Sequence, residues 1–433
     1  MSDKVVITGA GIAGLALGYK LAQAGRQVLV VEKENVVGGL ARSFRYGEYV
    51  FDVGPHRFHT DLPEINGFIL EVLAGDHLYV GRASGVWMFG RYFDWPLTAA
   101  SILKMPPAVI LRVGLDLFFG TAGGDGNFEE FIIKKYGRTL YRIFFKPYTE
   151  KFLGLSCAEI SKEWAITGVE RAVIDKRIES GDLKSFARSI LTTDSAMQFI
   201  YPKSGGIGRF AELLAQGIQA FGGEIHTGAE VEQLVVDQMR VTSVVINGRQ
   251  VECGCLVWTA PPQQLLPMLG LAPPELEFKP LLLFNYEISG RPLMDYQWCY
   301  YGDKNIPFNR VSIPTAFNPV LAPTGKTGVC VEVSDNVAAN GEAVLDLTIR
   351  KALVAVGLVA DVDVITTVHV ERVANAYPVY RLNYQDEMRK VASSLEEYGN
   401  IELLGRTGAF WYNNMDHSIE ASLCLAAELL TGA

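Results

Sequence analysis

A glycine-rich turn between two apolar runs is the feature that most constrains this chain. Val5–Thr8 is a β-branched run that predicts a strand, and it ends at GAGIAG, residues 9–14. A helical pattern of leucines follows and stops near Gly25, and a second apolar run, Val28–Val31, ends at Glu32. Strand, glycine turn, helix, strand and acid in this order predict a Rossmann-type unit that binds a dinucleotide.

Each glycine of this turn has an expected task. Gly9 allows the tight turn, Gly11 lets the backbone approach a pyrophosphate, and Gly14 lets the helix pack closely on the strand. The N-terminus of the helix then offers amide donors and positive partial charge to the phosphates. Glu32 ends the next strand, where a carboxylate can accept both ribose hydroxyls.

The segment behind the second strand distinguishes FAD from a nicotinamide dinucleotide. KENVVGGLARSF (33–44) adds a second glycine pair and Arg42, which a nicotinamide domain does not need. With this segment the chain resembles the glutathione-reductase-type FAD fold of the amine oxidase and protoporphyrinogen oxidase superfamily. The resemblance implies FAD as the cofactor. Its neighbours in this segment are then expected to be Lys33, Gly39, Leu40 and Arg42. A surface turn with a solvated arginine is the alternative.

Three later segments fit the same resemblance. Residues 201–237 predict a loop, a helix and a strand, and residues 254–262 predict a strand that ends near the dinucleotide. Residues 400–430 predict a strand, a turn and a final helix, whose N-terminus would suit the flavin atoms that gather negative charge. The cofactor neighbours implied here are Val231, Gly405, Arg406, Met415 and Asp416.

The expected fold class is therefore α/β, with a discontinuous FAD-binding Rossmann domain of the glutathione-reductase type. This domain is expected to comprise residues 1–85, 195–280 and 375–433. Residues 86–194 are expected to form a mainly helical region that covers the substrate. Residues 281–374 are expected to form a substrate domain around an antiparallel sheet.

Two short motifs at opposite ends of the chain resemble a narrower family, the UDP-galactopyranose mutases. GPHRFHTD (54–61) resembles the histidine-bearing loop of that family, and GRTGAFWYNNMDHS (405–418) resembles its C-terminal motif. The resemblance implies that His56 and Arg57 are neighbours of the flavin. His59 has either this role or a purely structural one.

The mutase resemblance also implies a nucleotide diphosphate sugar as substrate. Arginine suits a diphosphate because its planar fork donates two parallel hydrogen bonds. Positions that match the family are Arg171, Arg310, Tyr377 and Tyr412, and ordinary surface salt bridges are the alternative for each arginine. In that family the reduced flavin, through N5, is the nucleophile of a pyranose–furanose interconversion, so no side-chain nucleophile is needed.

A redox enzyme with the same fold is the main rival hypothesis. Such an enzyme, like an amine oxidase or protoporphyrinogen oxidase, passes hydride from substrate to FAD and then to oxygen. Aromatic residues between positions 87 and 152 would suit an apolar substrate, a stacked nucleobase or a helical core equally well. They are Trp87, Phe89, Tyr92, Phe93, Trp95, Phe144, Phe145, Tyr148 and Phe152. A non-catalytic FAD-bound scaffold is a third alternative.

The composition limits the kinds of molecule that the protein could bind and the cellular compartment in which it is expected. A formal net charge of −9 argues against a nucleic-acid binder, which would need a basic face. Six scattered cysteines without a His/Cys cluster give no metal site and favour a reducing cytoplasm. The apolar N-terminus lacks the basic region of a signal peptide. The oligomeric state is not fixed by the sequence.

A second apolar stretch, residues 96–120, is interrupted by Lys104, Arg112 and Asp116. These charges argue against a transmembrane helix. We expect a buried helical pair over the ligand site, with peripheral membrane contact as the alternative.

Overall fold

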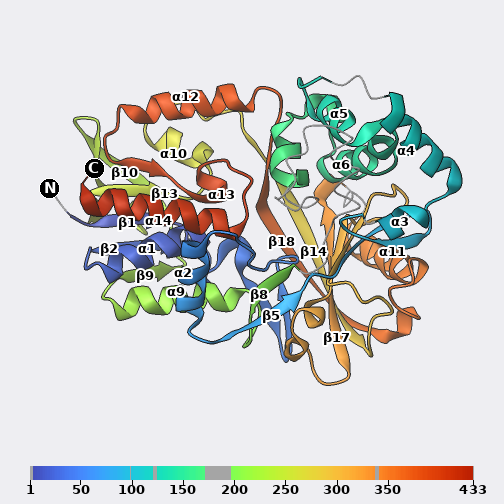
Figure 1. The fold of residues 1–433 in the computed structure, drawn as a ribbon. Coiled ribbons are helices and arrows are strands. Elements are labelled where there is room, and N and C mark those ends of the chain that lie inside the picture. The colour runs from blue at the N-terminus through green and yellow to red at the C-terminus, as the bar shows by residue number, and fades with distance from the viewer. Residues whose placement is uncertain (1–2, 98, 120–123, 171–196, 337–340, 433) are drawn as a thin grey trace.

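The computed structural model describes residues 3–97, 99–119, 124–170, 197–336 and 341–432. The chain forms two lobes, and Figure 1 shows both chain ends in the same lobe, beside a parallel sheet. The other lobe holds a larger sheet with helices on both sides (Figure 1). The candidate site lies where the elements of the two lobes meet.

The first lobe is built on a five-stranded parallel sheet. Its strands in spatial order are β19 (Ile401–Leu403), β13 (Cys255–Trp258), β1 (Val5–Thr8), β2 (Val28–Glu32) and β9 (Glu224–Thr227). They come from the beginning, the middle and the end of the chain. Both faces of the sheet are buried at the inner strands β1 and β2, which explains their unbroken apolar runs in the sequence.

Alternate residues of β1 pack against two different layers. Val5 and Ile7 join a core with the helices on one face, whereas Val6 joins a core with the elements on the other face. The first layer consists of α1 (Ile12–Gln23), α2 (Pro63–Leu73), α9 (Gly208–Ala220) and α14 (Met415–Thr431). The second layer consists of β10 (Val231–Asp237), β11 (Arg240–Ile246), β12 (Arg249–Glu252), α10 (Pro262–Met268) and α12 (Tyr384–Glu396).

The second lobe is built on a seven-stranded sheet. Its strands in order are β18 (Ile365–Val379), β14 (Glu277–Ser289), β17 (Lys326–Ser334), β16 (Arg310–Ser312), β15 (Trp298–Tyr301), β6 (Ser84–Met88) and β7 (Arg91–Asp94). Only β15 and β6 pair in parallel among these strands. The helices α5 (Phe128–Leu140) and α6 (Lys146–Leu153) cover one face, and α11 (Glu342–Ala355) covers the other.

The sheet of the second lobe begins earlier in the chain than the sequence suggested. Residues 86–194 were expected to be mainly helical, but β6 and β7 occupy the first part of this range and extend the sheet. Val86 of β6 lies directly opposite Phe93 of β7, and both side chains are buried in the core, which stabilises the strand pair. Residues 171–196 lie outside the described residues.

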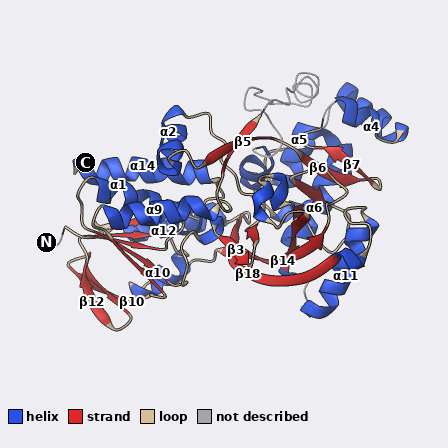
Figure 2. Cartoon of the chain, turned by 90° about the horizontal axis from the view of Figure 1, so that it is seen from below, coloured by secondary structure: helices blue, strands red, loops and turns tan. Residues whose placement is uncertain are grey.

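Further strand pairs lie outside the two main sheets. β5 (His77–Gly81) pairs antiparallel with β8 (Gln198–Pro202), and β3 (Ser43–Tyr46) pairs antiparallel with β4 (Tyr49–Asp52). Figure 2 shows β3 and β18 at the junction of the lobes. The histidine-bearing segment 54–61 therefore leaves β4 close to both lobes.

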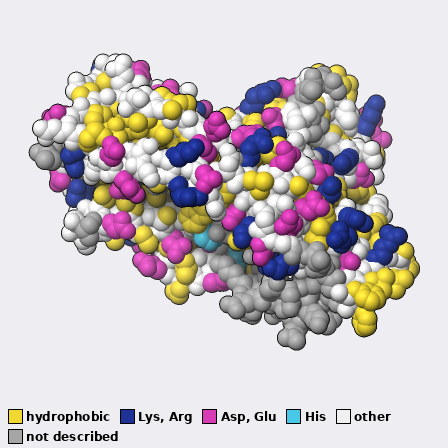
Figure 3. Space-filling model, turned by 90° about the horizontal axis from the view of Figure 1, so that it is seen from above, with side chains coloured by type: hydrophobic (Ala, Val, Ile, Leu, Met, Phe, Trp, Pro, Cys, Tyr) yellow, Lys and Arg dark blue, Asp and Glu magenta, His cyan; other side chains and the backbone are white. Residues whose placement is uncertain are grey.

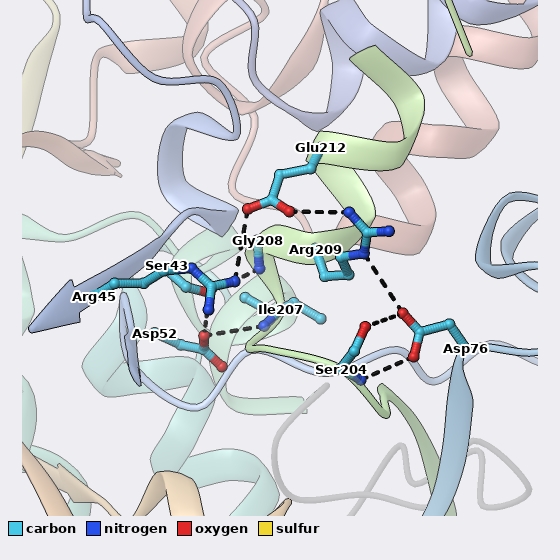
Figure 4. Close-up of polar contacts among 9 residues, drawn as sticks. All are labelled: Ser43, Arg45, Asp52, Asp76, Ser204, Ile207, Gly208, Arg209 and Glu212. Carbon is cyan, nitrogen blue, oxygen red and sulfur yellow. Dashed lines mark hydrogen bonds and ion pairs between the residues drawn. The ribbon is translucent and has the colours of Figure 1, made fainter. Parts of the chain in front are cut away.

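A buried carboxylate fixes the end of β4. The Oδ1 atom of Asp52 accepts hydrogen bonds from Ser43 Oγ at 2.6 Å and from the backbone amide of Ile207 at 3.0 Å, and Tyr201 donates to Oδ2. Burial raises the pKa of Asp52 to about 6, although these hydrogen bonds oppose the rise. Figure 4 shows how this network joins the β3–β4 pair to the start of α9.

The expectation of a buried helical pair in residues 96–120 was wrong. The segment forms α3 (Ala99–Leu103) and α4 (Pro107–Phe119), which present large apolar side chains to solvent. Exposed side chains of this kind are Leu103, Leu111, Leu115, Phe118 and Phe119. In Figure 3 hydrophobic side chains project from the end of the second lobe. Peripheral membrane contact by this segment stays a prediction.

No helix among the described residues has both the length and the apolar character needed to cross a membrane.

Candidate functional site

A first cavity lies at the carboxyl ends of the parallel strands. It is lined by the turn Gly9–Gly14, by Glu32 at the end of β2 and by the second glycine segment, residues 38–42. Thr259 at the end of β13 and Gly405 behind β19 complete this edge. Ligands of open α/β sheets bind at this edge, because loops and helix N-termini converge there.

The three glycines of the turn meet different surroundings. A Cβ atom on Gly9, whose φ is +95°, would lie 2.3 Å from Thr259 Oγ1, and one on Gly14 would lie 2.2 Å from the carbonyl oxygen of Gly9. Gly11 has a φ of −73°, and a Cβ atom there would meet no protein atom within 4 Å. The protein itself therefore requires Gly9 and Gly14, whereas the absence of a side chain at Gly11 keeps the cavity open.

Glu32 is held rigidly at the cavity. Its Oε2 accepts a hydrogen bond from the backbone amide of Ala10 at 2.7 Å, and its Oε1 accepts one from the amide of Glu34 at 2.9 Å. Each carboxylate oxygen has a second lone pair. Glu32 can therefore also accept hydrogen bonds from the hydroxyl groups of a ribose.

Several polar groups at the first cavity have no partner within the described parts of the chain. Arg42 Nε and His56 Nδ1 are buried without a hydrogen bond. The first amides of α1 and α14 also lack intrahelical acceptors, as at every helix start. Buried polar groups are rarely left unpaired, so a bound molecule is expected to supply the partners. This donor-rich edge fits the phosphates and ring atoms of FAD.

His56 is neutral in this environment. Burial, followed by the positive charges of Arg406, Arg310 and Arg57, lowers the pKa of His56 to about 3. A neutral imidazole can place either a donor or an acceptor against a neighbouring group. His59 lines neither of the two cavities and packs edge-on against Phe199, with 5.9 Å between ring centroids, which is the structural alternative for this residue.

A second cavity adjoins the first, and Asn414 lines both. Its polar lining includes Arg57, Arg310, Tyr377 and Tyr412. Aromatic rings form much of the rest: Trp95, Phe144, Phe145, Tyr148, Phe152, Trp164 and Tyr300. Of the aromatic residues noted between positions 87 and 152, five thus face this cavity, whereas Phe89 is exposed and Trp87 packs edge-on against Tyr92.

Arg310 is fixed by an acid on the neighbouring strand. The register of β16 and β17 places Arg310 directly opposite Glu332, and its Nε and Nη2 donate to the two carboxylate oxygens at 2.5 and 2.8 Å. Nη2 also donates to the hydroxyl of Tyr377 at 3.1 Å. Burial opposes the charge, but Glu332 raises the pKa of Arg310 well above its ordinary value. Arg310 is therefore a permanent, oriented cation.

Tyr412 lies between an aromatic and a cationic neighbour. Its ring stacks on Trp164 with 5.0 Å between centroids, and Cζ of Arg406 lies 5.2 Å from its ring centroid. Arg406 Nη1 donates to the carbonyl oxygen of Ala376 at 3.2 Å. Burial raises the pKa of Tyr412 and of Tyr377 above the ordinary value, so both hydroxyls remain donors at neutral pH.

The structure brings nearly all of the expected site residues together. The residues at the first cavity are Gly9, Gly11, Gly14, Glu32, Lys33, Gly39, Leu40, Arg42, His56, Val231, Gly405, Arg406 and Met415. Asp416 is an exception: it is buried beside His417 and does not line the cavity. Arg171 lies outside the described residues. Glu332 and Tyr300 were not expected, and no sequence motif marks them. Thr259 and Asn414 lie within the segments 254–262 and 405–418 that the sequence placed near the cofactor, but they were not singled out as site residues.

Comparison with protein families shows which family the chain belongs to. The family model described as flavin containing amine oxidoreductase matches residues 12–287. The chain belongs to this family. The predicted glutathione-reductase-type α/β fold is thereby confirmed, and its cofactor is FAD, as expected.

Individual relatives within and around this family differ in activity. A probable UDP-galactopyranose mutase of Klebsiella pneumoniae is 27% identical over 169 residues, which cover 37% of this chain and only 44% of that protein. A phytoene dehydrogenase of Streptomyces griseus is 24% identical over 367 residues, covering 75% of this chain and 71% of that protein. A crystal structure of reduced UDP-galactopyranose mutase matches with a TM-score of 0.85 at 21% identity, covering 100% of this chain and 95% of that one. These likenesses establish the fold and support a flavoenzyme.

Proposed function

We propose that this flavoenzyme acts on a nucleotide diphosphate sugar and interconverts its pyranose and furanose forms, as UDP-galactopyranose mutases do. The observation that carries the proposal is the second cavity, where Arg57 and Arg310 lie beside the hydroxyls of Tyr377 and Tyr412. Buried guanidinium groups with tyrosine donors suit an anionic substrate, because each group can donate to phosphate oxygens.

Arg310 retains donors for a diphosphate despite its pairing with Glu332. Its Nε and Nη2 serve Glu332 and Tyr377, and within the described residues its Nη1 makes no hydrogen bond. Nη1 carries two of the five N–H groups of a guanidinium. The stacked rings of Trp164 and Tyr412 offer an apolar face for a base or a sugar.

Bound FAD supplies, in its reduced form, an electron-rich nucleophile for chemistry at an anomeric carbon. The side chains of the chain have supporting tasks. Arg310 with Tyr377 would stabilise the negative charge of a departing diphosphate, and the aromatic wall would exclude water from the sugar. His56 and Arg42, with unpaired buried nitrogens, would orient the cofactor.

An oxidoreductase that passes hydride to FAD and then to oxygen is the second candidate. The aromatic wall of the second cavity and the similarity to phytoene dehydrogenase favour it. However, an amine would bring a positive charge toward Arg57 and Arg310, and an apolar substrate would leave the guanidinium group of Arg57, which unlike Arg310 has no paired carboxylate among the described residues, without an anion. The charge of the cavity therefore favours the nucleotide sugar.

Product analysis tests this proposal. FAD-loaded protein reduced with dithionite is incubated without oxygen with UDP-galactopyranose, UDP-glucose and UDP-arabinopyranose, and the nucleotide sugars are separated by anion-exchange chromatography. We expect an isomer of unchanged mass from at least one substrate. Recovery of every nucleotide sugar unchanged, by protein whose flavin is reduced by an amine or an apolar alcohol, would contradict the proposal.

A further inference from the structure

Arg57 differs from Arg310 because it has no acidic partner. Within the described residues its guanidinium makes one hydrogen bond, from Nη1 to the carbonyl oxygen of Pro55 at 3.0 Å, and it forms no ion pair with a carboxylate. Arg310 in the same cavity is neutralised by Glu332. The second cavity therefore contains one positive charge that no described carboxylate contacts directly, although the charge of Asp416 acts on Arg57 without forming an ion pair.

Two aromatic rings support this guanidinium. Its Cζ lies 4.4 Å from the ring centroid of Trp298 and 5.0 Å from that of Phe199. A second cation, Arg82, approaches Trp298 to 5.8 Å. Burial, and then the charge of Arg57, lowers the pKa of Arg82 to about 10, and burial also lowers the pKa of Arg57. The two cations thus share one ring.

The two cation–π contacts do not compensate for the hydration free energy that the guanidinium of Arg57 loses on burial. A cation–π contact contributes ~0.5–2 kcal/mol, whereas the removal of an ion from water costs several kcal/mol. Four of the five N–H groups of Arg57 have no acceptor within the described parts of the chain. An anion in the cavity would satisfy both the charge and these donors.

The position of Arg57 indicates which end of a substrate it meets. The preceding residue, His56, lines the first cavity, whereas Arg57 lines the second. Because the two residues are adjacent, we infer that Arg57 lies where the second cavity approaches the first, which is the side on which FAD would be bound. Under the proposed function, this part of the second cavity holds the sugar and the phosphate attached to its anomeric carbon.

We propose that Arg57 binds a two-oxygen anionic group at the flavin end of the substrate, either a carboxylate on the sugar or the phosphate attached to it. This assignment rests on the proposed function and deepens it. If Arg57 binds a carboxylate, the preferred substrate is a nucleotide-linked uronic acid. If Arg57 binds the phosphate, Arg57 and Arg310 both bind the diphosphate of the substrate. In the first case Arg57 determines which sugar is accepted, and in the second it contributes affinity for every nucleotide diphosphate sugar.

Binding titrations with FAD-loaded protein separate the two sources. The ligands are UDP, UDP-galactose, UDP-glucuronate, inorganic pyrophosphate and free glucuronate, followed by calorimetry and by the flavin absorbance. The variants are Arg57→Gln, which keeps a planar polar group, and Arg57→Lys, which keeps the charge. The control is Arg389→Ala, an exposed residue of α12 paired with Asp386.

We expect Arg57→Gln to raise at least one dissociation constant tenfold or more, Arg57→Lys to have a smaller effect, and the control to have none. A loss for UDP and UDP-galactose assigns the phosphate, and a loss for UDP-glucuronate alone assigns the carboxylate. If Arg57→Gln does not retain FAD, the same comparison is made with Arg57→Lys, whose preserved charge supports folding.

The outcomes that overturn this assignment differ from those that overturn the proposed function. Wild-type affinity of the Arg57 variants for every ligand would overturn the role of Arg57, while tight binding of nucleotide sugars would leave the proposed function intact. Arg57-dependent binding of pyrophosphate or glucuronate, without any binding of nucleotide sugars, would support the anion site and contradict the proposed function. Failure of the wild type to bind any of the five ligands would overturn the anion site.

Discussion

Substitution of Gly11 by valine should separate cofactor binding from folding. The φ of −73° suits any residue, and a Cβ atom at Gly11 would have no protein atom within 4 Å, so the apoprotein should tolerate the change. We expect its free energy of unfolding to change by less than about 1 kcal/mol. The added methyl groups would instead occupy the cavity that the pyrophosphate of FAD needs.

The loss of FAD affinity can be estimated from the hydrogen bonds at stake. A hydrogen bond to a charged group contributes ~1.5–3 kcal/mol, so displacement of a pyrophosphate from two amides of the α1 N-terminus costs ~3–6 kcal/mol. Each 1.4 kcal/mol corresponds to a factor of ten, so the dissociation constant of FAD should rise by about 10²- to 10⁴-fold.

Two further glycine variants provide the comparison. Gly67→Val in α2 adds the same side chain at an exposed site with no atom within 4 Å, and it should retain FAD. Gly9→Val should destabilise the protein itself, because of the Thr259 contact and the positive φ. The assays are FAD content after desalting, fluorescence titration of the apoprotein and its melting temperature. Wild-type FAD affinity in Gly11→Val, or destabilisation as large as in Gly9→Val, would refute this reasoning.

Three other variants test the second cavity and the buried acid. Arg310→Lys keeps a cation beside Glu332 but loses the planar fork of the guanidinium, so calorimetry should show UDP bound about ten- to a hundredfold more weakly. The FAD content should be unchanged. Wild-type affinity for UDP would show that Arg310 does not bind the phosphate. Tyr377→Phe should weaken UDP binding by only ~0.5–1.5 kcal/mol, and a larger loss than in Arg310→Lys would contradict this ranking. Burial raises the pKa of Asp52 from 3.8 to about 6, so between these pH values the folded protein binds a proton that the unfolded chain releases. The resulting contribution to the free energy of unfolding is fully present below pH 3.8 and is lost as the pH rises through about 6. Denaturant unfolding of wild type and Asp52→Asn should therefore show the stability of the wild type falling relative to the variant by about 2 kcal/mol between pH 4 and 7. A pH-independent difference would contradict the raised pKa.

The first cavity could be predicted from the sequence because its signals are local. Gly9, Gly11 and Gly14 share one turn, and Glu32 follows on the adjacent strand, so spacing alone places them together. Asp416 shows the limit of this reasoning. Adjacent residues of a helix point about 100° apart, so Met415 faces the cavity while Asp416 turns into the protein.

The second cavity could be predicted only in part because its charges depend on strand pairing. Arg310 was expected to bind phosphate, but its partner Glu332 is set by the β16–β17 register, which spacing in the sequence does not reveal. The missing partner of Arg57 is likewise visible only once the surrounding elements are in place. Sequence patterns identified these cations, whereas the fold determines which of them remains uncompensated.

Under the proposed function, turnover requires a reduced flavin but consumes no electrons. Anaerobic rapid mixing with candidate substrates tests it most directly, with the flavin absorbance and the product recorded together. We expect the dithionite-reduced protein to convert a nucleotide sugar over many turnovers without oxygen, hydrogen peroxide or net flavin oxidation, and the oxidised protein to be inactive. Bleaching of the oxidised flavin by an amine, an alcohol or an apolar substrate, at a rate that matches turnover, would contradict the claim.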